Sequence, residues 1–114
     1  MSGQPLEAAV RFLAGRAVID LKGDINAASE PVLTDAYSRA SAEARSVILN
    51  FVELGYMNSS GIGLIVTLLI RANRLGQRLY AFGLSDHYEE IFRLTRLNEA
   101  IKIFDSEQAA LAAS

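Results

Sequence analysis

The chain of 114 residues contains no cysteine and no tryptophan, and it has one histidine and two prolines. Without cysteine it cannot form a disulfide framework, a thiolate metal site or a cysteine nucleophile, a composition that suits a reducing cytoplasm. The first ten residues, MSGQPLEAAV, lack the basic start and apolar core of a secretory signal. The uncharged run at residues 61–70 is shorter than the ~20 residues needed to cross a bilayer. We therefore expect a cytoplasmic protein that does not insert into membranes.

An excess of basic charge is missing as well. Eleven lysines and arginines against thirteen acids give a formal net charge of -2, and the basic residues are scattered along the chain. Direct binding to nucleic acid is not expected, because affinity for a phosphate backbone depends on clustered positive charge. Hydrophobic residues make up 51% and charged residues 21%, as in soluble globular proteins. At this length we expect one domain, residues 1–114, that folds on its own.

The motifs of common catalytic sites are also lacking. Residues 55–61 do not form a phosphate-binding loop, because five residues separate the two glycines and no Gly-Lys-Ser/Thr follows. Ser59 and Ser60 do not lie in a G-x-S-x-G motif, and His87 is the only histidine that could serve as a base. We therefore predict no catalytic residue, no metal site and no cofactor. A small α/β hydrolase acting through Ser59 or Ser60 is the alternative from the enzyme class.

The pattern of apolar residues and turn signals predicts strands that alternate with helices. Strands are expected at residues 8–13, 16–21, 46–51, 78–82 and 101–104, and helices at about 29–43, 60–75, 86–94 and from Ser106 onward. Residues 22–26 are interpreted as a polar break and residues 55–59 as a loop. Strands joined by helices of ten or more residues pair in parallel through right-handed crossovers. The predicted fold class is therefore α/β, a mixed sheet of four to five strands with four helices packed on it.

The first two predicted helices differ in their apolar patterns. Ser29 is expected to cap the first helix, with Pro31 in its first turn. The predicted inward face of that helix consists of Val32, Leu33, Ala36, Tyr37 and Ala40. In the second helix one face consists of Ile62, Ile65, Val66 and Leu69, widened by Leu64, Leu68 and Leu75. Its first turns are either buried or expose apolar surface for a homodimer or another partner.

The segment at residues 56–66 places two hydroxyls and two glycines between a strand and the apolar helix. Free backbone N–H groups and the positive end of the helix dipole meet at such a place, so a phosphate on a serine there is accommodated. A phosphoserine adds a charge of about -1.5 to -2 and changes the surface without unfolding the domain. The alternative is that the serine is an ordinary helix cap and that Gly61 and Gly63 only allow close packing against the sheet.

Nearly the whole chain resembles the STAS domains, and within them the bacterial anti-sigma-factor antagonists. The resemblance is carried by the opening hairpin, by residues 23–26 (Gly-Asp-Ile-Asn), by residues 47–51 and by residues 57–63 (Met-Asn-Ser-Ser-Gly-Ile-Gly). The core motif of the family is Asp-Ser-Ser/Thr-Gly-Leu/Ile-Gly after a strand. The resemblance implies a protein that binds an anti-sigma factor, itself a serine kinase, and so frees a sigma factor. The kinase phosphorylates the first serine of the motif, which breaks the complex, and a metal-dependent serine phosphatase resets it.

Matched position by position, the resemblance makes Ser59 the phosphoacceptor. The implied partner-binding residues are Asn26, Asn58, Ser60, Gly61, Ile62 and Gly63. Asn26 and Asn58 both stand where the family has aspartate. An amide can still cap a helix, but it cannot pair with a basic residue as an anion or hold a metal. This difference leaves a second hypothesis, a non-phosphorylated STAS scaffold in a larger signalling or lipid-transport assembly.

Overall fold

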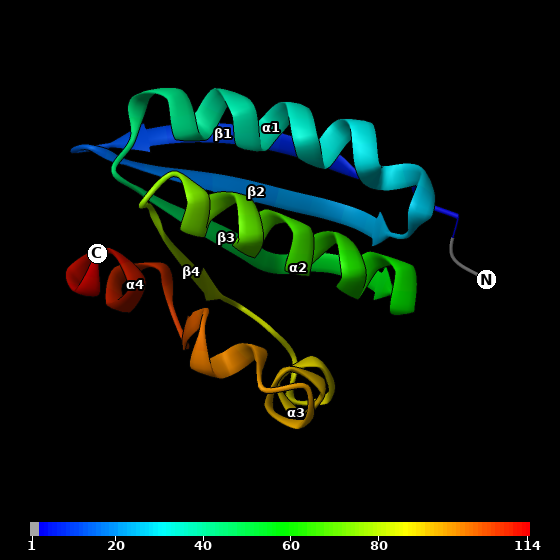
Figure 1. Ribbon diagram of the computed structural model, residues 1–114. Coiled ribbons are helices and arrows are strands. Elements are labelled where there is room, and N and C mark those ends of the chain that lie inside the picture. Colours follow the sequence, from blue (N-terminus) through cyan, green and yellow to red (C-terminus); the bar gives the residue numbers. More distant parts are fainter. Residues whose placement is uncertain (1–2) are drawn as a thin grey trace.

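The computed structural model describes residues 3–114 and contains a five-stranded sheet whose spatial order, β1-β2-β3-β4-β5, follows the chain (Figure 1). Its strands are β1 (Glu7–Leu13), β2 (Arg16–Ile25), β3 (Ser46–Met57), β4 (Arg78–Phe82) and β5 (Lys102–Phe104). The β1 and β2 strands pair antiparallel, whereas β2, β3, β4 and β5 pair in parallel. The predicted mixed α/β sheet is therefore confirmed.

Four helices cover the two faces of this sheet. They are α1 (Glu30–Glu43), α2 (Ser59–Arg74), α3 (Asp86–Leu94) and α4 (Glu107–Ala113), with 3-10 turns η1 (Ala27–Ser29) and η2 (Leu97–Glu99). Residues of α1, α2 and α3 form the main core with one face of the sheet, and α4 packs on the opposite face (Figure 1). Within residues 3–114, no helix combines the length and apolarity that a membrane span requires.

The faces that α1 and α2 bury agree only partly with the apolar patterns. Four of the five expected α1 residues are buried, and Val32 is half-buried. The buried stripe of α2 consists of Gly61, Ile65, Leu68 and Ala72. Ile62, Val66 and Leu69, which were expected to share the inward face with Ile65, are only half-buried. The first turns of α2 therefore both pack on the core and present apolar atoms to solvent.

Two strands run further than the sequence pattern predicts. The expected polar break at residues 22–26 is wrong, because β2 continues to Ile25, and most of the expected loop at residues 55–59 belongs to β3. Two register shifts each insert an extra residue into β3 opposite β2. At the second shift the buried carboxylate of Asp24 accepts a hydrogen bond from the Tyr56 N–H at 2.9 Å. A side chain therefore replaces a ladder bond there, which is why a polar segment can continue the strand.

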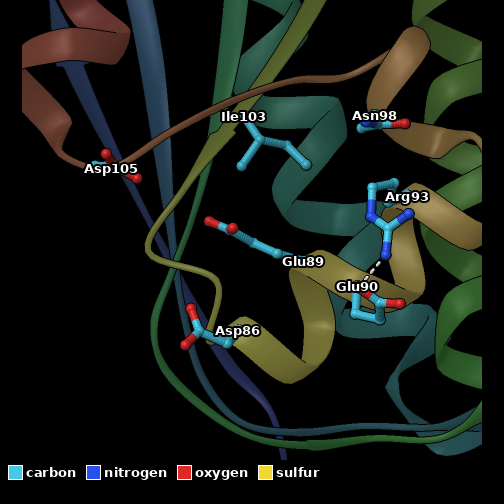
Figure 2. A pocket seen from close by; sticks show the side chains of 7 residues that line it. All are labelled: Asp86, Glu89, Glu90, Arg93, Asn98, Ile103 and Asp105. Atoms are coloured by element: carbon cyan, nitrogen blue, oxygen red, sulfur yellow. Dashed lines mark hydrogen bonds and ion pairs between the residues drawn. The ribbon is translucent and has the colours of Figure 1, made fainter.

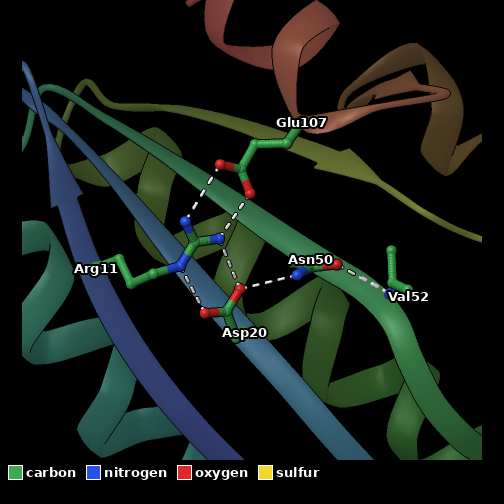
Figure 3. Close-up of polar contacts among 5 residues, drawn as sticks. All are labelled: Arg11, Asp20, Asn50, Val52 and Glu107. Carbon is green, nitrogen blue, oxygen red and sulfur yellow. Dashed lines mark hydrogen bonds and ion pairs between the residues drawn. The ribbon is translucent and has the colours of Figure 1, made fainter.

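A cluster of charged side chains fixes α4 to the open side of the sheet (Figure 3). The Arg11 guanidinium on β1 donates to Asp20 at 2.7 and 2.9 Å and to Glu107 on α4 at 3.2 and 2.7 Å. Asn50 joins the cluster by donating to the Asp20 carboxylate at 2.8 Å. Hydrogen bonding to Arg11 lowers the pKa of both the Asp20 and the Glu107 carboxyls. We call these four residues the Arg11 clamp.

Candidate functional site

The parallel strands β2 and β3 end side by side, because Ile25 pairs with Met57. Asn26 and Asn58 directly follow these two residues, so both lie at the carboxyl ends of neighbouring strands. The Asn58 N–H donates to the Ile25 carbonyl at 3.3 Å, which joins the two chain segments just beyond the last strand pair. The sheet therefore brings together two asparagines that are far apart in the sequence.

Asn58 is the residue that caps α2. Its backbone is extended, with φ -89° and ψ -175°, and its side-chain Oδ1 accepts a hydrogen bond from the Gly61 N–H at 2.9 Å. The alternative interpretation, that a serine is the cap, is wrong for this helix. Ser59 and Ser60 are instead the first two residues of α2, and both are exposed.

The exposed start of α2 has the properties of an anion site on its backbone. The first turn contains no acidic residue. Among the hydrogen bonds of residues 3–114, none uses the N–H groups of Ser59 or Ser60, since the cap satisfies only Gly61 and Ile62 donates to the Asn58 carbonyl. These two donors and the helix dipole favour negative charge at this end of the helix.

The two glycines of the segment have different surroundings. A Cβ at Gly61 would overlap the carbonyl oxygen of Ile25 and would lie 2.9 Å from the Met57 Cγ. Gly61 is buried, so the expectation that it contacts a partner is corrected: it lets α2 approach the end of β2. Gly63 is exposed, and a Cβ there would meet nothing within 4 Å. Close packing therefore explains Gly61 but not Gly63.

Asn26 has a similar capping role at the start of η1. Its Oδ1 accepts from the Ala28 N–H at 3.0 Å, while the Ser29 hydroxyl accepts from the Asn26 N–H at 3.0 Å. The same hydroxyl donates to the Asp24 carbonyl at 3.1 Å. Ser29 occupies the N-cap position of α1, as predicted, but its side chain caps no N–H group of that helix: the 3-10 turn precedes the helix, and the buried Ser29 side chain supports Asn26.

Residues 7–110 match the STAS domain. The chain belongs to the STAS domain family. An anti-sigma-B factor antagonist from Staphylococcus aureus is 26% identical to it over 86 residues, which are 75% of this chain and 80% of that protein.

Solved structures share the fold of this STAS domain. The Bacillus cell fate determinant SpoIIAA in its phosphorylated form aligns with a TM-score of 0.72 and 20% identity, covering 94% of this chain and 99% of that one. A sulfate transporter family protein from Wolinella succinogenes aligns with a TM-score of 0.77 and 17% identity, covering 90% and 87%.

The fold of this STAS domain brings most of the predicted site residues to one surface. Ser59, Ser60 and Gly63 are exposed there, and Asn26, Asn58 and Ile62 are half-buried. We call these six residues the α2-start surface; none of them carries a formal charge. Nearby Tyr56 adds an aromatic side chain that is 58% exposed.

Two residues that support this surface could not be identified from the sequence. Tyr88 on α3 accepts a hydrogen bond from the Met57 N–H at 2.8 Å, and Asp24 accepts from the Tyr56 N–H. Both bonds hold the end of β3, immediately before Asn58. For Asp24 the sequence offers one signal, its position after Gly23 in a largely apolar segment, because a buried carboxylate there needs hydrogen-bond donors. For Tyr88 no local pattern exists, since its partner lies 31 residues away.

A hollow that is separate from this surface lies between α3 and β5 of the STAS domain (Figure 2). It has a volume of about 440 Å³ and is lined by Asp86, Glu89, Glu90, Arg93, Asn98, Ile103 and Asp105. Arg93 pairs with Glu90 along α3, and the acids at the start of this helix face its positive end. His87, which was considered as a base, is exposed beside this hollow's Asp86. The serines do not line it.

Proposed function

We propose that this STAS domain is an anti-sigma-factor antagonist that docks a serine-kinase anti-sigma factor through the α2-start surface. In this proposal the kinase phosphorylates Ser59, the phosphate ends the complex, and a serine phosphatase restores the free hydroxyl. The role belongs in the cytoplasm, where sigma factors and ATP are present. The observation that carries the proposal is the exposed Ser59 hydroxyl at the start of α2, beside two N–H groups without hydrogen-bond partners in the described chain. The antagonist name of the Staphylococcus aureus relative and the phosphorylated form of SpoIIAA support it.

A phosphate on Ser59 changes the surface far more than it changes the fold. The α2-start surface is uncharged, so a partner that docks tightly on it removes water from neutral groups only. A dianion at its centre must either find a cation on the partner or stay hydrated, and both requirements oppose the original contact. Meanwhile the free N–H groups and the dipole of α2 favour the added charge within the domain. The modification therefore acts on binding and leaves the domain folded.

Transfer to Ser59 does not require a base from this chain. A kinase supplies the metal ions and the aspartate that accepts the hydroxyl proton, so the Ser59 oxygen attacks the terminal phosphoryl group of ATP and ADP leaves. Asn58 cannot accept a proton, but its cap holds the helix start in place. What this chain contributes is an accessible hydroxyl on a fixed backbone.

The two asparagines select the kind of partner that the surface accepts. In both, Oδ1 is used by a backbone N–H of the chain itself, and the amide nitrogen has no hydrogen-bond partner among residues 3–114. The side chains therefore offer donors to a partner, where aspartates would offer acceptors. We infer that the docked protein presents carbonyl or carboxylate oxygens to Asn26 and Asn58, not arginine or lysine.

A pull-down from the native cytoplasm with three variants tests the proposal. Ser59→Ala should capture the kinase, Ser59→Asp should capture much less of it, and Thr67→Ala, at an exposed α2 residue outside the α2-start surface, should capture as much as the parent. The captured protein, once purified and supplied with ATP and Mg²⁺, should add the mass of one phosphate to the parent and to Thr67→Ala but not to Ser59→Ala. Equal capture by both Ser59 variants, or a phosphate that persists in Ser59→Ala, contradicts the switch.

The second candidate is a STAS scaffold that docks without phosphorylation. It is favoured by the asparagines at positions 26 and 58 and by the shared fold of the Wolinella succinogenes transporter family protein. In that case the same pull-down should return a signalling or lipid-transport assembly, equally from the parent and from Ser59→Asp. Intact mass after incubation with ATP should then stay unchanged.

A further inference from the structure

The two edges of the sheet differ in length and in protection. The outer strand β5 has three residues, whereas β1 has seven and contains no proline and no lysine. Natural edge strands of this length are usually shortened, covered or broken by such residues, because an open edge pairs with other strands. The one arginine of β1, Arg11, is bound by Asp20 and Glu107 in the clamp. The β1 edge is therefore a free pairing surface.

The hairpin that joins β1 to β2 determines which backbone groups are free. Its loop is Ala14–Gly15, with φ of 52° and 84°, and Leu13 pairs with Arg16. In a two-residue hairpin the flanking pair exchanges hydrogen bonds, and bonded pairs then alternate along the strand. Residues 7, 9, 11 and 13 thus bond to β2. The N–H and C=O groups of Ala8, Val10 and Phe12 point away from the sheet.

Beside this edge lies a hollow of about 430 Å³ between β1 and α1. Its lining consists of Val10, Phe12, Ser38, Arg39, Ala42 and Glu43. Phe12 is 50% exposed, although an aromatic ring in a strand normally packs against a neighbour. An added strand would place its own side chains in this hollow and cover the Phe12 ring.

We propose that the β1 edge pairs with the same edge of a second copy, forming a two-fold dimer with one continuous sheet. Antiparallel pairing about Val10 sets Val10 opposite Val10 and Ala8 opposite Phe12. The outward N–H and C=O groups of one copy then face those of the other and can form hydrogen bonds. The large Phe12 ring lies beside the small Ala8. This dimer uses β1 and not the apolar face of α2.

The charges of the strand are compatible with self-pairing. Its two charged residues are Glu7 and Arg11. In this register Glu7 of one copy lies opposite Leu13 of the other and diagonal to Arg11, and Arg11 lies opposite Ala9. Neither charge meets its own kind, so the second copy is the occupant that fits the edge.

The dimer leaves the α2-start surface open. In the antiparallel hairpin the start of β1 lies next to the end of β2, where Asn26 follows. Two-fold pairing therefore places the two Ser59 residues at opposite ends of the joined sheet. The inference stands independently of the proposed phosphorylation.

Sedimentation equilibrium of the full chain, from about 5 to 500 µM, tests the dimer. Phe12→Lys places a charge in the dimer contact and should raise the dissociation constant at least about tenfold. Ile70→Lys is the matched control, because Ile70 on α2 is 48% exposed and lies outside the β1 edge. Dissociation by Ile70→Lys with no effect of Phe12→Lys overturns the proposal, as does a parent that remains monomeric at every concentration.

Amide exchange measured by NMR gives a second, residue-level test that needs no substitution. In a dimer, raising the concentration should slow exchange at Ala8, Val10 and Phe12, while Ala9 and Arg11 stay protected throughout because they bond to β2. Val10→Pro, which removes an outward N–H only, should keep the monomer folded and abolish this concentration dependence. Concentration-independent exchange at all three outward amides contradicts the pairing.

Discussion

The start of α2 and the Arg11 clamp are both polar, but they differ in whether their polar groups have partners within the chain. In the clamp, the Arg11 guanidinium is paired with two carboxylates, and the Asn50 amide donates to one of them, so these charges are used within the chain. At the start of α2, the side chains are neutral, and the N–H groups of Ser59 and Ser60 have no hydrogen-bond partner within residues 3–114. The paired charges of the clamp hold α4 on the sheet, whereas the free N–H groups at the start of α2 can bind an added anion. This contrast separates a structural cluster from a receptive site.

The largest expected effect comes from Gly61, which sets the depth of the helix start. Gly61→Ala should lower the free energy of unfolding by about 2–3 kcal/mol, because the added methyl overlaps the Ile25 carbonyl. Gly63→Ala, in open space, should instead be neutral or stabilising by up to about 1 kcal/mol through helix propensity. Urea unfolding measures both. Equal effects of the two substitutions would show that α2 does not rest on Ile25.

Tyr88 tests whether the end of β3 is held from α3. Tyr88→Phe leaves the buried N–H of Met57 without its acceptor and should cost about 1–2 kcal/mol. Tyr56→Phe, at an exposed ring, should cost almost nothing. Thermal unfolding compares the two, and amide exchange at Met57 should rise in the Tyr88 variant alone. An unchanged exchange rate there would contradict the assigned hydrogen bond.

The clamp should appear in the pH dependence of stability. Arg11 lowers the pKa of Asp20 and Glu107, so their contribution is complete above the ordinary carboxyl pKa of about 4 and is lost as the pH falls through the lowered values. Arg11→Met should cost about 1 kcal/mol at pH 7, since the partly exposed groups are screened, and the difference should shrink in acid.

The control for the clamp is Arg39→Met, which breaks an exposed pair with Asp35 on α1. It should cost only about 0.3–0.5 kcal/mol. A cost for Arg11→Met that stays constant down to pH 2 would mean that Arg11 acts by packing and not by charge.

Asn58→Asp should raise the free energy of unfolding by only a few tenths to about 1 kcal/mol, because a carboxylate at the cap interacts favourably with the helix dipole. The same change places a negative charge beside a phosphate on Ser59. We therefore expect the phosphorylated Asp variant to lose its phosphate faster than the parent when both are incubated with the cognate serine phosphatase. Equal or slower release would remove the idea that Asn58 delays the reset.

The candidate site was predictable where its signals are local. Ser59 at a helix start follows from two hydroxyls before an apolar, uncharged run, and its exposure confirms that part of the prediction. The sequence does not show which polar side chain caps α2, because both asparagine and serine can do so. The hydrogen bond from the Gly61 N–H to the Asn58 side chain identifies the cap. The support from Asp24 and Tyr88 could not be predicted, since each bonds to the backbone of a distant segment.

The sequence by itself determined the alternation of strands and helices, the mixed sheet and the place of the serines, because periodicity, caps and glycine breaks act over a few neighbouring residues. Tertiary structure alone decided how far β2 and β3 extend, that Gly61 is buried while Gly63 is open, and that β1 keeps a free edge. Each of these features depends on which distant segment brings its backbone into contact. Every residue type has much the same backbone N–H and C=O groups, so such contacts cannot be recognised from the pattern of side chains along the sequence.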